Sequence, residues 1–191
     1  MRGESGLVNS LARKSRFAKR PSCSLVTGHH GSGKSTELRR LQGNLGNEQE
    51  KYFTVFCDIR LDVDILDLDY PNLLISMIGQ LAQQIRQRLR IELGPGYFRD
   101  RFQELKEILT SEVDFESLTL KKGLLKATAA IKSSPSTRKM MRKLLEPRTD
   151  QWIFSANSVI GDAVVELRKL DYQGLVIVID GLDKLTAMRH K

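Results

Sequence analysis

A glycine-rich run of eight residues constrains this 191-residue chain more than any other feature of its sequence. The run is GHHGSGKS, residues 28–35, and it fits the pattern G-x-x-x-x-G-K-[ST] without departure. A β-rich stretch, residues 22–27, precedes it, and leucines at helical spacing follow it. This order predicts a buried strand, a glycine turn and a helix, as in an α/β fold with a parallel sheet.

Such a loop suits a bound phosphate. Glycines allow backbone conformations that a Cβ forbids, so that successive N–H groups can point at an anion, and the following helix adds the positive end of its dipole. Lys34 is expected to reach the β- and γ-phosphates of a nucleotide, and Ser35 to ligate Mg²⁺. His29 and His30 are expected to act through their backbone amides. The predicted nucleotide-binding residues are Gly28, His29, His30, Gly31, Ser32, Gly33, Lys34, Ser35 and Thr36.

A second motif lies near the other end of the chain. The run LVIVID, residues 175–180, is an apolar strand that ends in an acid, and in the matching pattern the carboxylate, here Asp180, holds the Mg²⁺ shell. Asp183 follows three residues later. Its carboxylate either polarises a water for attack on the γ-phosphate or caps a helix or turn. The predicted metal ligands are Ser35 and Asp180, and the predicted catalytic residues are Lys34, Asp180 and Asp183.

Three recognisable strands and long helices define the predicted architecture. The expected strands are residues 22–27, 52–59 and 175–179, and amphipathic helices are expected over 35–45, 72–91 and 152–170. The run 175–179 is apolar throughout, which favours a central position in a parallel sheet.

The expected domain organisation is simple. Residues 1–20 are interpreted as a basic lead-in and 21–191 as one domain. Roughly a hundred residues separate the second and third strands, far more than a crossover helix needs. We therefore predict a helical insertion at about 95–150.

The positive charge of the chain is concentrated in one block. The chain carries 31 basic and 23 acidic side chains, a net charge of +8. Residues 121–148 alone hold nine basic and one acidic side chains. No aromatic residue interrupts this block, so it offers no stacking platform for single-stranded nucleic acid. A solvated face is favoured over a nucleic-acid contact, and a membrane-surface or protein contact also stays open.

Several classes of protein are excluded or disfavoured by composition. No run approaches the ~20 apolar residues of a membrane span, and the N-terminal residues lack the apolar run of a signal peptide. Cys23 and Cys57 both lie in apolar runs, which predicts buried free thiols in a reducing compartment. The histidines have no metal-ligand spacing with these cysteines. A cytoplasmic location is the expectation.

The two motifs together resemble a known family. GHHGSGKSTELRRL with VIVIDGLDKL looks like the bacterial AAA/STAND-type P-loop ATPases, which include NACHT-like signalling proteins. YFTVFCDIR, followed by an acidic stretch and a long helix, is also similar to that group. The resemblance covers roughly residues 20–93 and 151–186. It implies ATP with Mg²⁺, β–γ phosphoanhydride hydrolysis coupled to a conformational switch, and self-association or a protein partner.

Departures from the family pattern keep two alternatives open. Lys184 stands where NACHT-like members usually have another acid, and no strand follows Asp180, which predicts a chain truncated after this motif. One alternative is a nucleotide-gated interaction module that does not hydrolyse. The other is a P-loop kinase for a small molecule, which needs arginines on a closing lid. The candidates for that lid are Arg86, Arg88, Arg90, Arg99 and Arg101.

Overall fold

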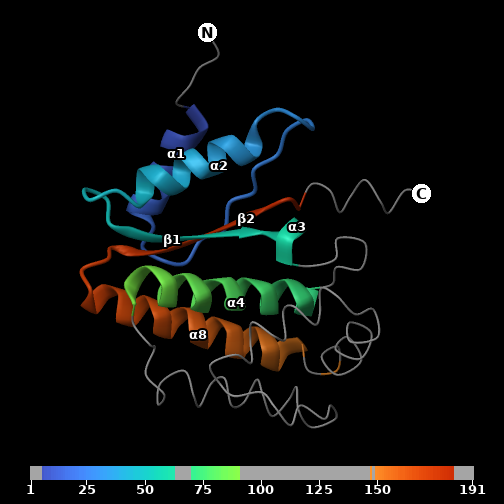
Figure 1. Ribbon diagram of the computed structural model, residues 1–191, viewed down its shortest axis with the longest axis vertical. Coiled ribbons are helices and arrows are strands. Elements are labelled where there is room, and N and C mark those ends of the chain that lie inside the picture. Colours follow the sequence, from blue (N-terminus) through green and yellow to red (C-terminus); the bar gives the residue numbers. More distant parts are fainter. Residues whose placement is uncertain (1–5, 63–69, 91–146, 148, 183–191) are drawn as a thin grey trace.

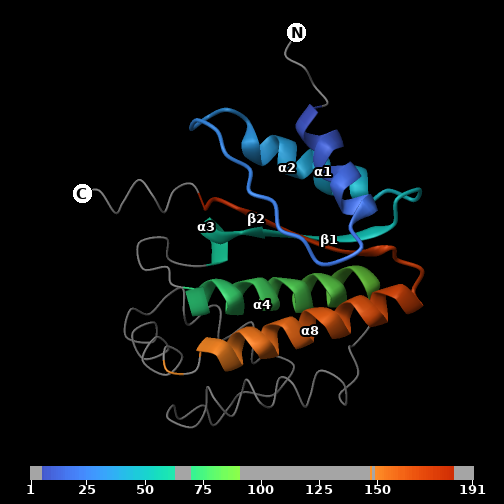
Figure 2. The same ribbon diagram turned by 180° about the vertical axis from the view of Figure 1, so that it is seen from behind.

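The computed structural model describes residues 6–62, 70–90, 147 and 149–182. These residues form three layers, with a small parallel sheet between two pairs of helices (Figure 1). Helices α1 and α2 lie on one face of the sheet, and α4 and α8 lie on the other (Figure 2). The bounds are α1 Gly6–Phe17, α2 Lys34–Leu45, β1 Tyr52–Asp58, α3 Ile59–Asp62, α4 Tyr70–Leu89, α8 Thr149–Lys169 and β2 Gly174–Asp180. The chain is therefore an α/β protein with a parallel sheet.

The two strands pair in one continuous register. Tyr52 lies opposite Gly174 at the start of the pair, and Asp58 lies opposite Asp180 at its end. The strands are parallel neighbours although more than a hundred residues separate them, as expected for strands joined through helical layers. The carboxyl ends of both strands consequently lie at the same end of the sheet, and so do the two acids, Asp58 and Asp180. This end is called the carboxyl edge of the sheet below.

Apolar residues cover the sheet on both faces. On one face the strand residues Phe53, Val55 and Cys57 join the buried side of α4 and α8. On the other face Tyr52 and Val176 pack against a smaller cluster from α1 and α2. Burial from both sides explains why β1 reads as a nearly continuous apolar run rather than an alternating one. The cluster residues from the helices are Ile78, Leu81, Ile85, Ala156, Val159, Ala163 and Leu167 on one face, and Val8, Ala12, Leu41 and Leu45 on the other.

Side chains of α4 satisfy the outer edge of β1. The Gln84 amide donates to the Phe56 carbonyl (3.0 Å) and accepts from the Phe56 N–H (3.3 Å). Arg88 donates to the Thr54 carbonyl (2.6 Å) and lies over the Phe53 ring. Three backbone groups of β1, the N–H and C=O of Phe56 and the C=O of Thr54, thus find partners on α4.

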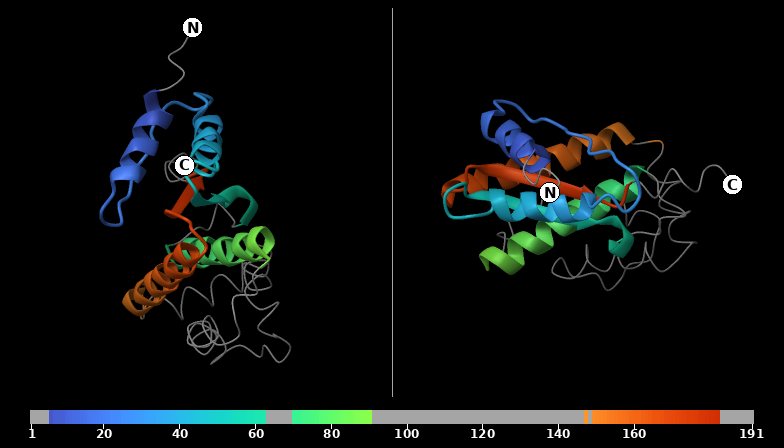
Figure 3. Two further views of the ribbon diagram at one scale, coloured as in Figure 1. Left: turned by 90° about the vertical axis from the view of Figure 1, so that its left-hand side faces the viewer. Right: turned by 90° about the horizontal axis from the view of Figure 1, so that it is seen from above.

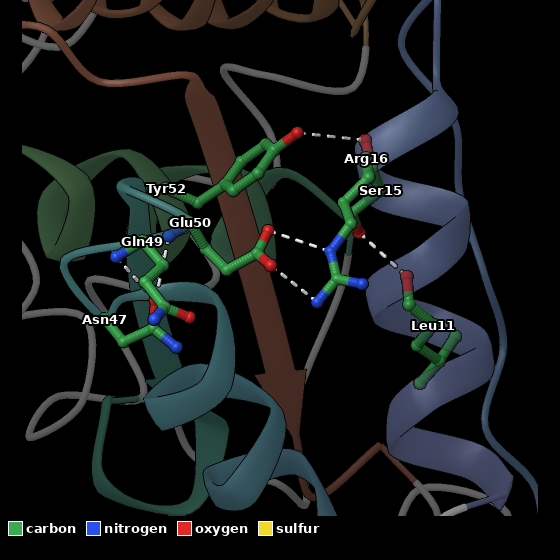
Figure 4. Close-up of polar contacts among 7 residues, drawn as sticks. All are labelled: Leu11, Ser15, Arg16, Asn47, Gln49, Glu50 and Tyr52. Atoms are coloured by element: carbon green, nitrogen blue, oxygen red, sulfur yellow. Dashed lines mark hydrogen bonds and ion pairs between the residues drawn. The ribbon is translucent and has the colours of Figure 1, made fainter.

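Helix α1 is fastened to the connection between α2 and β1 (Figure 4). Arg16 forms an ion pair with Glu50 (2.7 Å), and the Tyr52 hydroxyl donates to the Ser15 carbonyl (3.4 Å). The Asn47 carboxamide oxygen accepts the Glu50 N–H (2.8 Å), which holds that turn in place. Residues 6–17, expected to be part of a lead-in, are therefore an ordered helix that packs on the core.

The prediction of a strand over residues 22–27 is wrong. No strand forms there, and no backbone hydrogen bond joins this segment to β2. It runs as an irregular connection on the β2 side of the sheet, with Leu25 80% exposed (Figure 3). Lys14 of α1 instead bonds to the Cys23 carbonyl (3.3 Å) and the Ser24 hydroxyl (2.9 Å). A β-rich sequence becomes a strand only when a neighbour supplies hydrogen-bond partners, and here none does.

Two further expectations fail for the same reason. Cys23 is exposed rather than buried, whereas Cys57 on β1 is buried as predicted, and neither forms a disulfide. Within the described part of the chain the sheet has two strands rather than three. Among the described residues β2 has β1 as its sole neighbour in the sheet, so the predicted central position is not found there, and five of its seven residues are only half-buried.

The other described elements agree with the sequence. The helices expected over 35–45, 72–91 and 152–170 and the strands expected over 52–59 and 175–179 are confirmed, each within three residues of the expected bounds. The expected insertion at 95–150 lies outside the described residues except for 147, 149 and 150, and α8 begins at Thr149. Among the described helices, none combines the length and apolar character that crossing a bilayer requires.

Candidate functional site

The glycine-rich loop lies between the irregular segment and the start of α2. Gly31 and Gly33 have φ angles of +77° and +84°, a left-handed conformation that side chains with a Cβ rarely adopt. The Ser32 N–H donates to the His29 carbonyl (3.2 Å) and closes the turn. Both glycines are therefore needed for the shape of this loop; Gly33 is a fixed position of the motif, and Gly31 is at a variable one.

Helix α2 begins at Lys34 with no side-chain hydrogen bond at its N-cap residue, Gly33. The amides of the first helical turn have no intrahelical acceptor and carry the positive end of the helix dipole. Glu37, the acid of this turn, pairs with Arg40 (2.8 Å). The start of α2 thus presents N–H donors on the side of the molecule where both strands end (Figure 1).

The lysine of the motif reaches back over its own loop. Lys34 Nζ donates to the carbonyl oxygens of Gly28 (2.9 Å) and His29 (3.0 Å). An ammonium group has three donors, so it can exchange such carbonyl contacts for phosphate oxygens near the same place. The loop positions this positive charge beside the first turn of α2.

Ser35 and Asp180 are brought into contact although 145 residues separate them. The Ser35 hydroxyl donates to Asp180 Oδ1 (3.0 Å). Asp180 is 5% exposed, and its second carboxylate oxygen, Oδ2, is buried without a hydrogen-bond partner. A buried carboxylate oxygen without a donor is costly, and a hard divalent cation is a group that such an oxygen and a hydroxyl can hold. The two residues predicted as metal ligands therefore fit Mg²⁺.

A second carboxylate lies beside this pair and was missed by the sequence analysis. Asp58 ends β1 opposite Asp180, and it is 8% exposed. Arg60 grips it with two guanidinium nitrogens: Nε bonds to Oδ1 (2.6 Å) and Nη2 bonds to Oδ2. Nη2 also lies 3.7 Å from Asp180 Oδ2. The signal in the sequence was that FTVFCD, like VIVID, is an apolar strand that ends in an acid.

The positive charge around Asp58 lowers the pKa of its carboxyl group. The hydrogen bond from the Arg60 guanidinium holds the pKa of the Asp58 carboxyl below its ordinary value. Burial opposes this by raising the pKa, and the positive charge of Arg39 on α2 adds to the lowering. Asp58 is therefore an ionised group at neutral pH despite its burial.

The remaining predicted residues fall into two groups. His29, His30 and Thr36 are exposed, so the histidine rings are not part of a buried cluster. Asp183 and Lys184 lie outside the described residues. Within the described ranges, no group of three or more histidine, cysteine or acidic side chains could hold a metal ion by itself. Any metal here would thus need the hydroxyl of Ser35 or oxygens of a ligand.

The arginines considered for a kinase lid are not at the carboxyl edge of the sheet. Arg88 contacts Thr54, which lies four residues before Asp58, or ~13 Å along the strand. Arg86 and Arg90 are exposed near the same end of α4, and Arg99 and Arg101 lie outside the described residues. Among the described arginines, Arg60 is the one that hydrogen-bonds to an acid at the strand ends.

No family model, curated protein or solved structure matches this chain. The resemblance to AAA/STAND-type ATPases accordingly stays a prediction from the two motifs. The arrangement itself supplies three chemical capacities at the carboxyl edge of the sheet: backbone donors and an ammonium group for phosphate, a hydroxyl–carboxylate pair for a divalent cation, and a second carboxylate held by a guanidinium.

Proposed function

We propose that this chain binds ATP together with Mg²⁺ at the glycine-rich loop and the ends of the two strands. The observation that carries the proposal is the 3.0 Å contact between Ser35 and Asp180. The two sequence motifs are independent stretches of chain, and a chance match to either gives no reason for them to meet. Their contact supports the roles that the motifs assign to them in metal binding.

Each residue of the site has a part in this proposal. The amides of residues 28–33 and of the first turn of α2 surround the phosphates, and Lys34 pairs with the β- and γ-phosphates. Ser35 and Asp180 hold the Mg²⁺ that bridges those phosphates. The preference for adenine, ATP hydrolysis as a conformational switch, self-association or a protein partner, and a cytoplasmic location rest on the family resemblance.

A second candidate is a nucleotide-gated interaction module that does not hydrolyse ATP. The position of Arg60 favours it, because its guanidinium engages Asp58. A carboxylate that already accepts two charged hydrogen bonds is a poor base for activating a water. Asp58 and Asp180 are the buried acids among the described residues. Arg60 engages the first and the proposal assigns the second to Mg²⁺, so neither is left to act as a base beside the loop.

Nucleotide binding is tested by fluorescence anisotropy with a fluorescent ATP analogue. Lys34→Ala should weaken binding at least about tenfold, the loss expected when a charged hydrogen bond disappears. Ser35→Ala should remove most of the gain that Mg²⁺ gives. Lys169→Ala is the matched control, since Lys169 pairs with Glu166 on the surface of α8. Failure of the wild-type chain to bind, or equal binding by Lys34→Ala, would refute the proposal.

The fate of the bound nucleotide is tested by a single-turnover assay with γ-labelled ATP. Release of inorganic phosphate supports a hydrolase, and recovery of intact ATP supports the interaction module. Transfer of the label to a small acceptor supports the kinase alternative, which the position of Arg88 disfavours.

A further inference from the structure

Two buried carboxylates end neighbouring strands at the same register position. Asp58 and Asp180 face each other across the parallel pair, and both are more than nine-tenths buried. Adjacent strands lie about 4.8 Å apart, so the two negative charges are close neighbours. Like charges at this separation in a partly desolvated site repel each other, and a positive charge beside them offsets the repulsion.

Arg60 supplies that charge, but unequally. Two of its nitrogens bond to the two oxygens of Asp58, whereas its approach to Asp180 is a 3.7 Å ion pair without a hydrogen bond. Asp180 Oδ2 consequently has no donor although it is buried. Asp58 therefore has donors on both carboxylate oxygens, whereas Asp180 has one oxygen without a donor, 3.7 Å from the Arg60 guanidinium.

The Arg60 side chain is the most exposed of the three side chains. The Arg60 side chain is 38% exposed, against 9% for Asp58 and 6% for Asp180. Arg60 belongs to the four-residue helix α3, directly after β1, and its aliphatic stem passes Gly181. A Cβ at Gly181 would lie 3.3 Å from Arg60 Cγ. The Arg60 side chain thus reaches solvent, whereas the two carboxylates are buried at the strand ends.

We propose that Asp58 is a second carboxylate of the divalent-cation site, and that Arg60 competes with the cation for Asp58 and Asp180. This inference rests on the proposed function for the identity of the cation, and it adds a residue and a mode of regulation. Mg²⁺ is usually held by one or two carboxylates together with phosphate oxygens and water. A guanidinium and a divalent cation repel each other, so metal entry displaces Arg60 from the carboxylates.

The consequence is that Arg60 sets the affinity of the site for the divalent cation. With Arg60 on Asp58, the cation meets one carboxylate and a positive charge, and its affinity is low. With Arg60 displaced, the cation meets two carboxylates and the Ser35 hydroxyl. The bond between Arg60 and Asp58 thus opposes loading until the phosphates of a nucleotide add their own negative charge.

Titration of the purified chain with Mn²⁺, followed by electron paramagnetic resonance, tests this without any nucleotide. Arg60→Gln should bind Mn²⁺ about tenfold more tightly than wild type, because a repelling charge is removed from a partly solvated site. Adding Asp58→Asn or Asp180→Asn to Arg60→Gln should reverse the gain. Arg40→Gln is the control, since it removes an exposed arginine that pairs with Glu37 away from the two carboxylates, and it should leave Mn²⁺ affinity unchanged.

Each outcome decides the matter. Equal or weaker Mn²⁺ binding by Arg60→Gln overturns the proposal, as does a double variant with Asp58→Asn that keeps the gain, or the absence of Mn²⁺ binding in every variant. If Arg60→Gln does not fold, Arg60→Lys replaces it. Lysine keeps the positive charge but cannot form both hydrogen bonds to Asp58. The Arg60→Lys variant should therefore bind Mn²⁺ more tightly than wild type, by a smaller factor than Arg60→Gln. An affinity at or below that of wild type overturns the proposal.

The fluorescent ATP measurement, run in parallel, separates the two proposals. Tighter Mn²⁺ binding by Arg60→Gln with no ATP binding by any variant refutes the proposed function and supports the two-carboxylate cation site. ATP binding that depends on Lys34, with Mn²⁺ affinity indifferent to Arg60, refutes the inference and supports the proposed function.

Discussion

The strands β1 and β2 both end in an aspartate at the same register position, but the two carboxylates have different hydrogen-bond donors. Asp58 at the end of β1 accepts hydrogen bonds from a guanidinium through both oxygens. Asp180 at the end of β2 accepts from a neutral hydroxyl through one oxygen and leaves the other without a donor. Burial alone does not give a carboxylate its role, because both are buried. What differs is which partner already compensates the charge.

This difference predicts that Asp58 contributes mainly to the stability of the fold and Asp180 mainly to ligand binding. A saturated carboxylate stabilises the fold, and its removal leaves an arginine without its partner. A carboxylate with an orphan oxygen is a local cost to the fold, and such costs persist where a ligand uses them. We therefore expect substitutions at the two positions to have opposite profiles in stability and in binding.

The largest expected effect concerns Asp180 and nucleotide binding. Asp180→Ala should lower the affinity for ATP in the presence of Mg²⁺ about a hundredfold, or ~2.7 kcal/mol, because an anionic metal ligand is lost. In the presence of a chelator the variant and the wild type should bind alike. Fluorescence anisotropy with and without Mg²⁺ measures both quantities. An equal loss under the two conditions would mean that Asp180 does not act through the metal.

The next effect concerns Asp58 and the fold. Asp58→Asn should lower the free energy of unfolding by about 1–3 kcal/mol, since it removes the charged acceptor of Arg60 in a mostly buried place. Urea unfolding followed by circular dichroism measures the change. The same substitution at the surface pair, Asp171→Asn opposite Lys51, should cost less than about 1 kcal/mol. Equal costs at the two positions would remove the contrast between a buried and an exposed pair.

The pH dependence of stability should report the bond between Arg60 and Asp58. Arg60 lowers the pKa of Asp58 in the folded state below the ordinary value of 3.8. The resulting stability is present above that ordinary value and is lost as pH falls through the lower, folded-state pKa. Arg60→Gln should therefore lose less stability than wild type on acidification from pH 6 to pH 3, in urea unfolding at both pH values. A loss as large as that of wild type would show that Arg60 does not set the pKa.

The smallest effect is the stability of a second Asp180 variant. Asp180→Asn keeps the shape of the side chain and an acceptor for Ser35, but it removes a buried charge next to Asp58. The free energy of unfolding should stay unchanged or rise by up to about 1 kcal/mol. Thermal unfolding at neutral pH provides the measurement, and destabilisation beyond 1 kcal/mol would place Asp180 with the saturated carboxylates.

Local patterns were sufficient for most elements and for one half of the site. Helices α4 and α8 have long apolar periodicity, and the β1 and β2 sequences are apolar runs bounded by polar residues, so each could be predicted from its own residues. Ser35 and Asp180 could be paired in advance because each belongs to a motif with a fixed place beside a strand or helix.

Long-range geometry explains what the sequence could not provide. Residues 22–27 have the composition of a strand, yet pairing depends on a partner elsewhere in the chain, and no local pattern reports it. Asp58 is one acid after one strand, and it gains meaning only when β1 and β2 are known to be neighbours in register. The grip of Arg60 on Asp58 depends on the turn that α3 makes, which propensity does not encode.

The contacts that Gln84 and Arg88 make with β1 have a consequence for how molecules of this protein meet one another. An exposed strand edge is a template on which a strand from another copy can add, which is a common start of aggregation. Here the outward N–H and C=O of Phe56 and the C=O of Thr54 are already bonded to side chains of α4. A strand from another copy could pair with the β1 edge only after these bonds are broken. The side chains of α4 therefore oppose aggregation through that edge.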